Sequence, residues 1–337
     1  MLESFANFLQ NTGLYALISS GGIDAVKTII MIAIACVLLY LAIVKKFEPL
    51  LLLPIAFGML LSNLPMIKDS SAIMMHTEFF TNPEYMTDGK YINVGYICQH
   101  GGLLDLLYLG VKLGIYPPLI FVGIGCMTDF GPLIANPKSI LLGAAAQFGV
   151  FFTFVGALVL SALVPSINFG IKEAASIGII GGADGPTAIY VTKSLAPALL
   201  PAIAVAAYSY MALIPVIQPP IMKLKTRKKD RMIVMEQLRP VSKTEKILFP
   251  IIVTIIVALI IPDAVSLVGC LMLGNLIKES GVVERLTKMA QNELMNIITL
   301  FLGVTVGATA TASSFLSAQT IGIIVLGLIA FCFSTVG

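Results

Sequence analysis

Long apolar stretches recur along most of this chain, and they limit what it can fold into. Many of them approach the roughly 20 residues that an α-helix needs to span the hydrocarbon core of a bilayer. Of the 337 residues, 58% are hydrophobic and only 12% are charged, whereas ordinary soluble domains carry about 25% charged residues. The sequence therefore predicts an all-α, polytopic membrane protein.

Ten apolar runs are candidates for spanning segments, and a basic loop divides them into two groups. Residues 1–46 hold an amphipathic opening segment, which suits a helix at the membrane interface or a loose terminus, and the first transmembrane helix. Residues 47–222 and 247–337 hold the other runs, on either side of the loop at 223–246. The runs cover residues 27–44, 49–64, 103–126, 140–164, 174–191, 195–222, 247–261, 264–277, 294–306 and 320–334.

The loop at residues 223–246 sets the expected orientation. It contains 9 of the 21 Lys and Arg residues, and the positive-inside rule places such loops in the cytoplasm. If Lys45 and Lys46 are also inside, the mostly polar stretch at residues 66–102 lies outside the cell membrane. The basic loop is expected to be a solvated topology signal or, alternatively, a docking surface for an acidic partner.

Two parts of the chain resemble each other and are expected to cross the membrane in opposite directions. The matching segments are LLSNL at 60–64 with MLGNL at 272–276, and LIFVG at 119–123 with TLFLG at 299–303. The first match places Asn63 opposite Asn275. Short apolar matches also arise by chance, but the opposite orientations favour an inverted-topology repeat. We predict a first repeat with two helix breaks at 47–222 and a second repeat at 247–337, incomplete at its C-terminal end.

Two glycine-rich segments interrupt the apolar pattern, at residues 123–137 and 176–190. Hydrocarbon tolerates such discontinuous helices only where protein shields the backbone or where it lines a cavity. Asp184 lies at the second break, between Gly182 and Gly185, and a carboxylate inside a membrane costs roughly 2.5–3.5 kcal/mol. We therefore expect a mid-membrane sodium or proton site, with the Thr187 hydroxyl and the backbone carbonyls of Gly182 and Gly185 as further oxygen ligands. The alternative is that Asp184 simply caps a helix.

Other polar residues are candidate ligands for the same sodium ion. Asp129 lies in the first break, nearer the edge of its span, and suits a structural role as well as an ion site. Ser209 and Tyr210 follow Tyr208 inside an apolar run. There the hydroxyls complete a cation shell, carry a proton or only hydrogen-bond a neighbouring helix. Asn275 is included because of its place in the second repeat.

The remaining polar residues favour no other class of site. Cys98 alone of the five cysteines lies outside the apolar runs, and no CxxC motif is present. His76 and His100 share one polar loop and are too isolated for a metal centre or a catalytic triad. We expect no metal other than sodium, hence no transition metal. Because the basic residues are clustered as topology signals, we also expect no nucleic-acid partner.

Five longer segments carry a specific resemblance. They are GIGCMTDFGPLIANPKSILLGAAAQFG (123–149), IGIIGGADGPTAIYV (177–191), AVAAYSYMALIPVIQPPIMK (204–223), EKILFP (245–250) and GNLIKESGVVERL (274–286). Together they resemble the beta subunit of the sodium-transporting, biotin-dependent decarboxylases, a family that includes the oxaloacetate, methylmalonyl-CoA, glutaconyl-CoA and malonate decarboxylases. The resemblance extends over nearly the whole chain from Lys45.

This resemblance implies a function and a set of partners. Carboxybiotin, made by a carboxyltransferase alpha subunit and held on a biotin carrier subunit, would lose carbon dioxide here, and the released free energy would export sodium with uptake of a proton. No biotin would be attached to this chain. A small gamma or delta subunit would anchor the complex in the bacterial inner membrane, where a homo-oligomer is also expected. The essential aspartate of the family maps onto Asp184, and a tyrosine implicated in ion or proton handling maps onto Tyr210.

The sequence leads to one further expectation, and two alternative functions are open to it. A family segment of the pattern NPLIGSAGVSAVPMAAR is not found in these residues, so we expect this sequence to be a truncated form of a longer protein. A sodium-coupled organic-acid symporter is the alternative function, although no Lys or Arg lies clearly mid-span to hold its anion. A purely structural membrane anchor would leave the two glycine-rich breaks, each with a carboxylate, unexplained.

Overall fold

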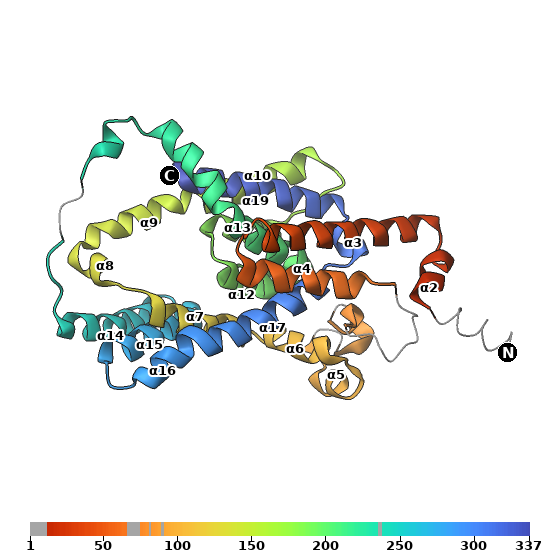
Figure 1. Ribbon diagram of the computed structural model, residues 1–337, viewed down its shortest axis with the longest axis horizontal. Coiled ribbons are helices and arrows are strands. Elements are labelled where there is room, and N and C mark those ends of the chain that lie inside the picture. The colour runs from red at the N-terminus through yellow and green to blue at the C-terminus, as the bar shows by residue number, and fades with distance from the viewer. Residues whose placement is uncertain (1–11, 66–74, 81, 89–90, 235–237) are drawn as a thin grey trace.

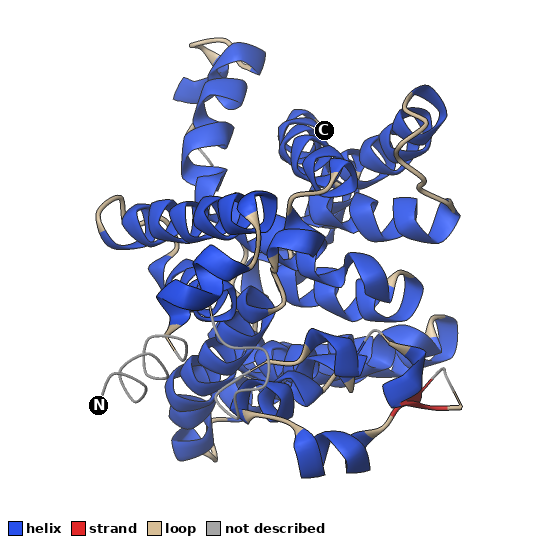
Figure 2. Ribbon diagram, turned by 90° about the vertical axis from the view of Figure 1, so that its right-hand side faces the viewer, coloured by secondary structure: helices blue, strands red, loops and turns tan. Residues whose placement is uncertain are grey.

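The computed structural model describes residues 12–65, 75–80, 82–88, 91–234 and 238–337, and helices dominate it (Figure 1). Within these ranges, the only strands are β1 (Met86–Thr87) and β2 (Tyr91–Ile92), which pair antiparallel. They lie at the periphery of the molecule (Figure 2). The all-α class predicted from the sequence is therefore confirmed.

The helices alternate between long segments and short connecting turns. The first half holds α2 (Gly13–Ser19), α3 (Gly22–Ile43), α4 (Pro49–Asn63), η1 (Thr77–Phe80), η2 (Pro83–Tyr85), α5 (Val94–His100), α6 (Leu103–Lys112), α7 (Tyr116–Met127), α8 (Gly131–Ala135), η3 (Pro137–Ser139), α9 (Ile140–Ala146) and α10 (Phe148–Leu163). The second half holds α11 (Ile171–Gly178), η4 (Ile179–Gly182), α12 (Gly185–Leu195), η5 (Pro197–Leu199), α13 (Leu200–Lys225), η6 (Asp230–Met232), α14 (Lys243–Ile260), η7 (Pro262–Ala264), α15 (Val265–Ser280), α16 (Glu284–Met289), η8 (Ala290–Leu294), α17 (Met295–Ala308), α18 (Ala312–Phe315) and α19 (Ala318–Val336).

Several of these helices are long and apolar enough to cross a membrane. Within the described residues, α3, the helical segment Pro137–Leu163 and α19 each have the required length, and α6 with α7 has it as a bent pair. The outward face of α14 exposes Ile252, Ile255 and Leu259, and a large exposed apolar face is typical of contact with lipid. The polytopic membrane class is thus confirmed.

The apolar run at residues 103–126 forms two helices. The axes of α6 and α7 differ by 70°, and Gly114 between them has a φ of +76°, a conformation that costs glycine little. Pro117 and Pro118 occupy the first turn of α7, where the N–H groups that proline lacks would have no intrahelical acceptor. In the interior of one helix continued from α6, the same prolines would break the hydrogen-bond pattern. The bend therefore follows from the sequence Gly114 to Pro118.

Both predicted helix breaks are present. The first separates α7 from the short α8, and the second separates α11 from α12. Two apolar cores hold these elements in place. One lies among α3, α4, α6, α7, α13 and α17, and the other lies among α10, α11, α12, α13 and α19. Helix α13 contributes to both, because Tyr208 belongs to the first core and Tyr210 to the second.

Helices from the two predicted repeats cross each other at glycines. Helix α4 packs against α17, and α7 packs against α15. A Cβ atom on Gly307 would lie 2.0 Å from the Ile55 carbonyl oxygen, and one on Gly274 would lie 2.0 Å from that of Val122. Small residues of this kind allow membrane helices to approach closely. The inverted repeat itself stays a prediction.

Two expectations fall partly outside the described ranges. These are the interfacial segment, of which residues 1–11 are not described, and the polar stretch at 66–102, of which residues 66–74, 81 and 89–90 are not described. In the remainder, α2 and α5 are short helices. The sidedness of the loops stays a prediction.

Candidate functional site

The break between α11 and α12 places Asp184 at the start of a helix. After α11, the 3₁₀ turn η4 ends at Gly182, and Ala183 takes a left-handed φ of 54°. Asp184 returns to an extended conformation and is the N-cap of α12, with Pro186 in the first turn. Proline suits this position because the first N–H groups of a helix have no intrahelical acceptor.

The carboxylate of Asp184 is partly buried and is held by one neighbour. Its Oδ1 accepts a hydrogen bond from the Thr187 backbone N–H at 3.3 Å, and its Oδ2 accepts one from the Thr187 hydroxyl at 2.6 Å. The helix-capping role considered from the sequence is therefore confirmed. A cap uses only part of the acceptor capacity of a carboxylate, so an ion-binding role at Asp184 is compatible with it and stays a prediction.

Tyr208 is the aromatic side chain that faces this break. It is 1% exposed, and a Cβ atom on Gly185 would lie 2.3 Å from its ring. Its hydroxyl interacts electrostatically with the Asp184 carboxylate. Within the described part of the chain this buried hydroxyl has no hydrogen-bond partner, which is uncommon because buried polar groups are nearly always paired. The sequence had marked Tyr208 only as one of three polar residues in its run.

Tyr210 lies on a different side of α13. Its hydroxyl donates a hydrogen bond to the Ile324 backbone carbonyl, and its ring packs near Gly327 and Phe331. It thus ties α13 to α19. Ser209 lies in α13 between the two tyrosines, but its side chain is outside the described part of the structure. Gly182, also a predicted sodium ligand, ends η4 with its backbone exposed.

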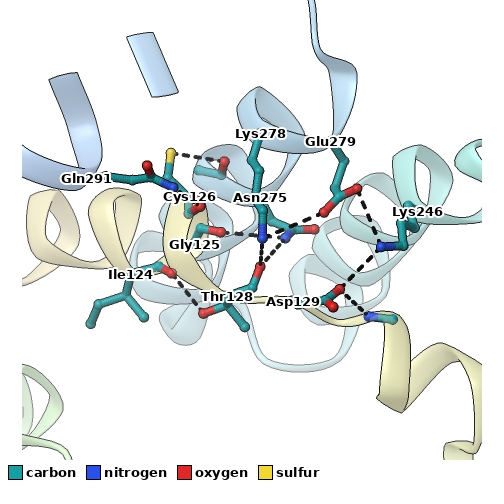
Figure 3. Close-up of polar contacts among 12 residues, drawn as sticks. Ile124, Gly125, Cys126, Thr128, Asp129, Lys246, Asn275, Lys278, Glu279 and Gln291 are labelled. Atoms are coloured by element: carbon teal, nitrogen blue, oxygen red, sulfur yellow. Dashed lines mark hydrogen bonds and ion pairs between the residues drawn. The ribbon is translucent and has the colours of Figure 1, made fainter. Parts of the chain in front are cut away.

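A second polar cluster surrounds the C-terminal end of α7 (Figure 3). The side-chain amide of Asn275 donates to the Thr128 carbonyl at 3.2 Å and to the Gly125 carbonyl at 3.5 Å. The Lys278 ammonium donates to the same Thr128 carbonyl at 3.0 Å, and the Gln291 amide donates to the Cys126 carbonyl at 2.5 Å. The last carbonyls of a helix lack intrahelical donors and favour a cation. Helices α15 and η8 therefore supply the hydrogen-bond donors, and α15 also the positive charge, for the carbonyls at the end of α7.

Asp129 belongs to this second cluster. Its Oδ1 accepts from the Gly131 N–H at 2.9 Å and lies 3.3 Å from the Lys246 ammonium, which is 4.0 Å from Glu279 (Figure 3). The Asp129 side chain is 58% exposed, so the pair contributes little to stability. No hydrogen bond or ion pair among the described residues joins Asp129 or Asn275 to Asp184. The structure therefore divides the predicted sodium ligands between two places.

The basic loop is fastened to the same end of the molecule. Arg239 donates to the Ile134 carbonyl at 3.2 Å and to Glu245 at 3.0 Å. Glu245 also accepts from Ser242 in a capping box at the start of α14. The hydrogen bond from Arg239, followed by those from Ser242, lowers the pKa of Glu245 to about 2. Glu245 therefore stays ionised at every pH at which the protein is expected to work.

Comparison with known proteins connects these two breaks to a family. The family model for the Na⁺-transporting oxaloacetate decarboxylase beta subunit matches residues 27–337. This chain belongs to that family. Both helix breaks and the helices α12, α13 and α15 lie within the matched residues, so family membership covers every candidate site residue.

Named relatives of the beta family are similar to almost the whole chain. The methylmalonyl-CoA decarboxylase subunit beta of Propionigenium modestum is 56% identical over 335 residues, which are 99% of this chain and 80% of that protein. The glutaconyl-CoA decarboxylase subunit beta of Acidaminococcus fermentans is 53% identical and covers 91% of this chain and 73% of its own length. The oxaloacetate decarboxylase beta chain of Klebsiella pneumoniae is 48% identical, with 99% and 82% covered.

These relatives confirm the family resemblance read from the sequence. Together with the apolar helices, they confirm a multi-pass membrane protein of the bacterial decarboxylase beta family. The names of these relatives mention different acids or acyl-CoAs, although their identities to this chain are similar.

Proposed function

We propose that this chain is the membrane subunit of a sodium-pumping decarboxylase, and that it couples the loss of carbon dioxide from carboxybiotin to sodium export and proton uptake. The carboxyltransferase alpha subunit, the biotin carrier and a small gamma or delta subunit are the proposed partners, and sodium is the transported substrate. The observation that carries this proposal is the Asp184 break, where a partly buried carboxylate caps α12 beside Tyr208, whose buried hydroxyl has no hydrogen-bond partner among the described residues.

The residues at the break fit a sodium ion. Sodium is a hard cation that prefers oxygen ligands, and the break brings together the Asp184 carboxylate and the Thr187 hydroxyl. The Tyr208 ring packs on the adjacent Gly185, so its hydroxyl is a further candidate ligand. Backbone carbonyls of the Gly182–Gly185 turn would supply the rest. A buried hydroxyl without a partner is satisfied when its oxygen contacts a cation or a bound water.

Asp184 provides the coupling in this proposal. The ionised carboxylate binds sodium, and protonation of the carboxylate removes the charge that holds the ion, so that sodium leaves outward as a proton enters. Moving one charge against 100 mV costs about 2.3 kcal/mol. One or two sodium ions per decarboxylation is the load that we propose. Tyr210 remains a proposed participant in ion or proton handling, on the family resemblance alone.

Asp129 and Asn275 lie at the end of α7, in a cluster separate from Asp184. The Asn275 Oδ1 atom is buried and has no hydrogen-bond partner among the described residues. A sodium ligand at this position would serve a second site, next to the Thr128 carbonyl that Lys278 already contacts. We therefore propose Asp184 as the centre of the transport site and keep Asp129 and Asn275 as candidates for an accessory one.

The replacement Asp184→Asn tests the proposal without removing the helix cap, because Asn and Asp cap helices about equally well. We expect sodium-dependent decarboxylation of carboxybiotin by the assembled complex to fall by at least about tenfold, equivalent to about 1.4 kcal/mol in the barrier. The measurement is carbon dioxide release with and without sodium, with thermal stability recorded for both proteins.

Asp129→Asn is the matched comparison, since it neutralises the carboxylate of the other break. Retention of full sodium-dependent activity in Asp184→Asn would refute the proposed site. Loss in Asp129→Asn together with retention in Asp184→Asn would move the transport site to the end of α7.

A further inference from the structure

A pocket of about 180 Å³ lies apart from both helix breaks described above. It opens where the C-terminal end of α6 meets the start of α13 and the turn that follows α17. Its lining contains no residue of the Asp184 break and none of the cluster at the end of α7. The residues that line the pocket include Lys112, Tyr108, Thr77, Thr309, Thr311 and Ala198.

Lys112 brings a positive charge to this pocket, and the described protein does not neutralise it. The ammonium lies 5.7 Å from the centroid of the Tyr108 ring, at the outer distance for a cation–π contact. It takes part in none of the hydrogen bonds or ion pairs of the described chain. A partly buried charge without a partner costs free energy, so a negatively charged ligand beside Lys112 would be stabilised.

The acidic residue of the same helix is already engaged elsewhere. Asp105 is 0% exposed. Its Oδ2 lies 2.6 Å from the His76 ring nitrogen and accepts from the Gly102 N–H at 2.9 Å, while its Oδ1 accepts from the His76 N–H. Asp105 therefore hydrogen-bonds the segment that holds His76, and within the described ranges it forms no hydrogen bond or ion pair with Lys112.

The rest of the lining combines polar and apolar side chains. Tyr108 and Thr309 share a side-chain hydrogen bond, Thr77 and Thr311 are further polar residues of the lining, and Pro197 and Pro201 add apolar surface. A concave site with a few convergent polar groups and one charge is typical of a small-ligand pocket. Its volume is several times that of one water molecule, about 30 Å³ in the liquid.

We propose that this pocket binds a small free monovalent anion, of the size of chloride or a short monocarboxylate, at the Lys112 ammonium. This site is independent of the proposed decarboxylation. Lys112 lies inside the apolar run at residues 103–126, although the sequence interpretation counted no Lys or Arg as clearly mid-span. The 70° bend between α6 and α7 places Lys112 at the end of α6, where it lines the pocket.

Line broadening of the chloride-35 NMR signal by the purified full-length protein tests the proposal directly, with sodium held constant and HEPES as the other anion. We expect a saturable broadening that acetate or formate reverses, and its loss in Lys112→Met. Lys193→Met is the matched control, because Lys193 also lies over a tyrosine ring, at 5.1 Å, but outside the pocket, and it should retain the broadening. Ala198→Leu, which fills the pocket without removing the charge, should weaken it.

Several results would overturn the site. These are the absence of saturable broadening in the wild-type protein, its persistence in Lys112→Met, or wild-type behaviour of Ala198→Leu, the last of which remains informative if Lys112→Met fails to fold. Displacement by phosphatidylglycerol in mixed micelles but not by acetate would assign the pocket to a lipid headgroup and contradict a free small anion. None of these readouts depends on decarboxylation.

Discussion

Two tyrosines that are two positions apart in α13 have different surroundings, and this separates the roles open to them. Residues i and i+2 point to different sides of a helix. Tyr208 therefore packs on Gly185 beside Asp184, whereas Tyr210 hydrogen-bonds Ile324 in α19. A sequence pattern shows only that both interrupt an apolar run. Packing against two different cores decides which tyrosine lies beside the start of α12.

Replacing Tyr208 by Phe removes a hydroxyl for which the described part of the chain offers no hydrogen-bond partner, and it keeps the ring that packs on Gly185. We expect the sodium concentration for half-maximal activity to rise by about tenfold, or about 1.4 kcal/mol of lost binding. Thermal stability should be unchanged or slightly higher, since no hydrogen bond is lost. Sodium titration of decarboxylation measures the first effect, and thermal unfolding measures the second.

Tyr210→Phe provides the comparison, because it removes the hydrogen bond to Ile324. That loss should destabilise the protein by about 1 kcal/mol. An altered sodium dependence in Tyr210→Phe with none in Tyr208→Phe would support the family-based role of Tyr210 and contradict the role proposed for Tyr208.

At the scale of helices, α7 and α17 each end at a backbone carbonyl that accepts a hydrogen bond from an asparagine of a distant helix. Asn275 of α15 donates to the Thr128 carbonyl after α7, and Asn63 of α4 donates to the Ala310 carbonyl after α17 at 2.8 Å. Both asparagines are buried. They are the pair that the sequence match placed opposite each other, so their equivalent contacts support the predicted repeat.

Asn275→Leu tests this completion of α7, since it removes the donor and keeps a similar volume. The Gly125 carbonyl loses its side-chain donor and Thr128 keeps only Lys278. We expect a loss of stability of about 1–3 kcal/mol, seen as a lower thermal midpoint. Asn63→Leu should behave alike if the two repeats are equivalent. Asn292→Leu is the control, because that exposed amide hydrogen-bonds only the Lys288 carbonyl four residues earlier among the described residues. If Asn275→Leu and Asn292→Leu had the same thermal midpoint, the hydrogen bonds of Asn275 to the end of α7 would add no stability.

At the scale of the whole molecule, the sequence predicts the spans far better than their pairing. Hydrocarbon requires apolar segments of a certain length, so the runs that became α3, α4, α10, α13 and α19 are visible in the sequence. The crossings of α4 with α17 and of α7 with α15 depend on single glycines and asparagines that meet only in three dimensions. The cap of Asp184 could be predicted because Asp before Gly-Pro is a local signal. The packing of Tyr208 on the neighbouring Gly185 and the pocket beside Lys112 depend on distant segments.

The expected depth of Asp184 in the membrane depends on which sides of the membrane the segments before α9 and after α12 occupy. Asp129 and Ile134 are tied to Lys246 and Arg239, next to the loop expected inside, while the start of α13 shares a pocket with Met75 and Thr77, in the stretch expected outside. Between Ile134 and the start of α13, the helical segment Pro137–Leu163, which contains α9 and α10, is long and apolar enough to cross the membrane once. If both loops lie on the expected sides, helices α11 and α12 would enter and return on the outer side. At 8 and 11 residues they extend only about 12 and 17 Å at 1.5 Å per residue, so we propose that their shared break lies near the middle of a core about 30 Å thick.

This arrangement predicts that Cys98 and residue 228 lie on opposite sides of the membrane. Cys98 is exposed in α5 and Lys228 is exposed in the basic loop. A membrane-impermeant maleimide should label Cys98 in right-side-out spheroplasts and should label much less of the Cys98→Ser variant. Lys228→Cys in that background should react only in inverted vesicles. Labelling of both positions from the same side would mean an even number of crossings between them. Helices α11 and α12 would then cross as one broken span, and the depth assigned to Asp184 would need another basis.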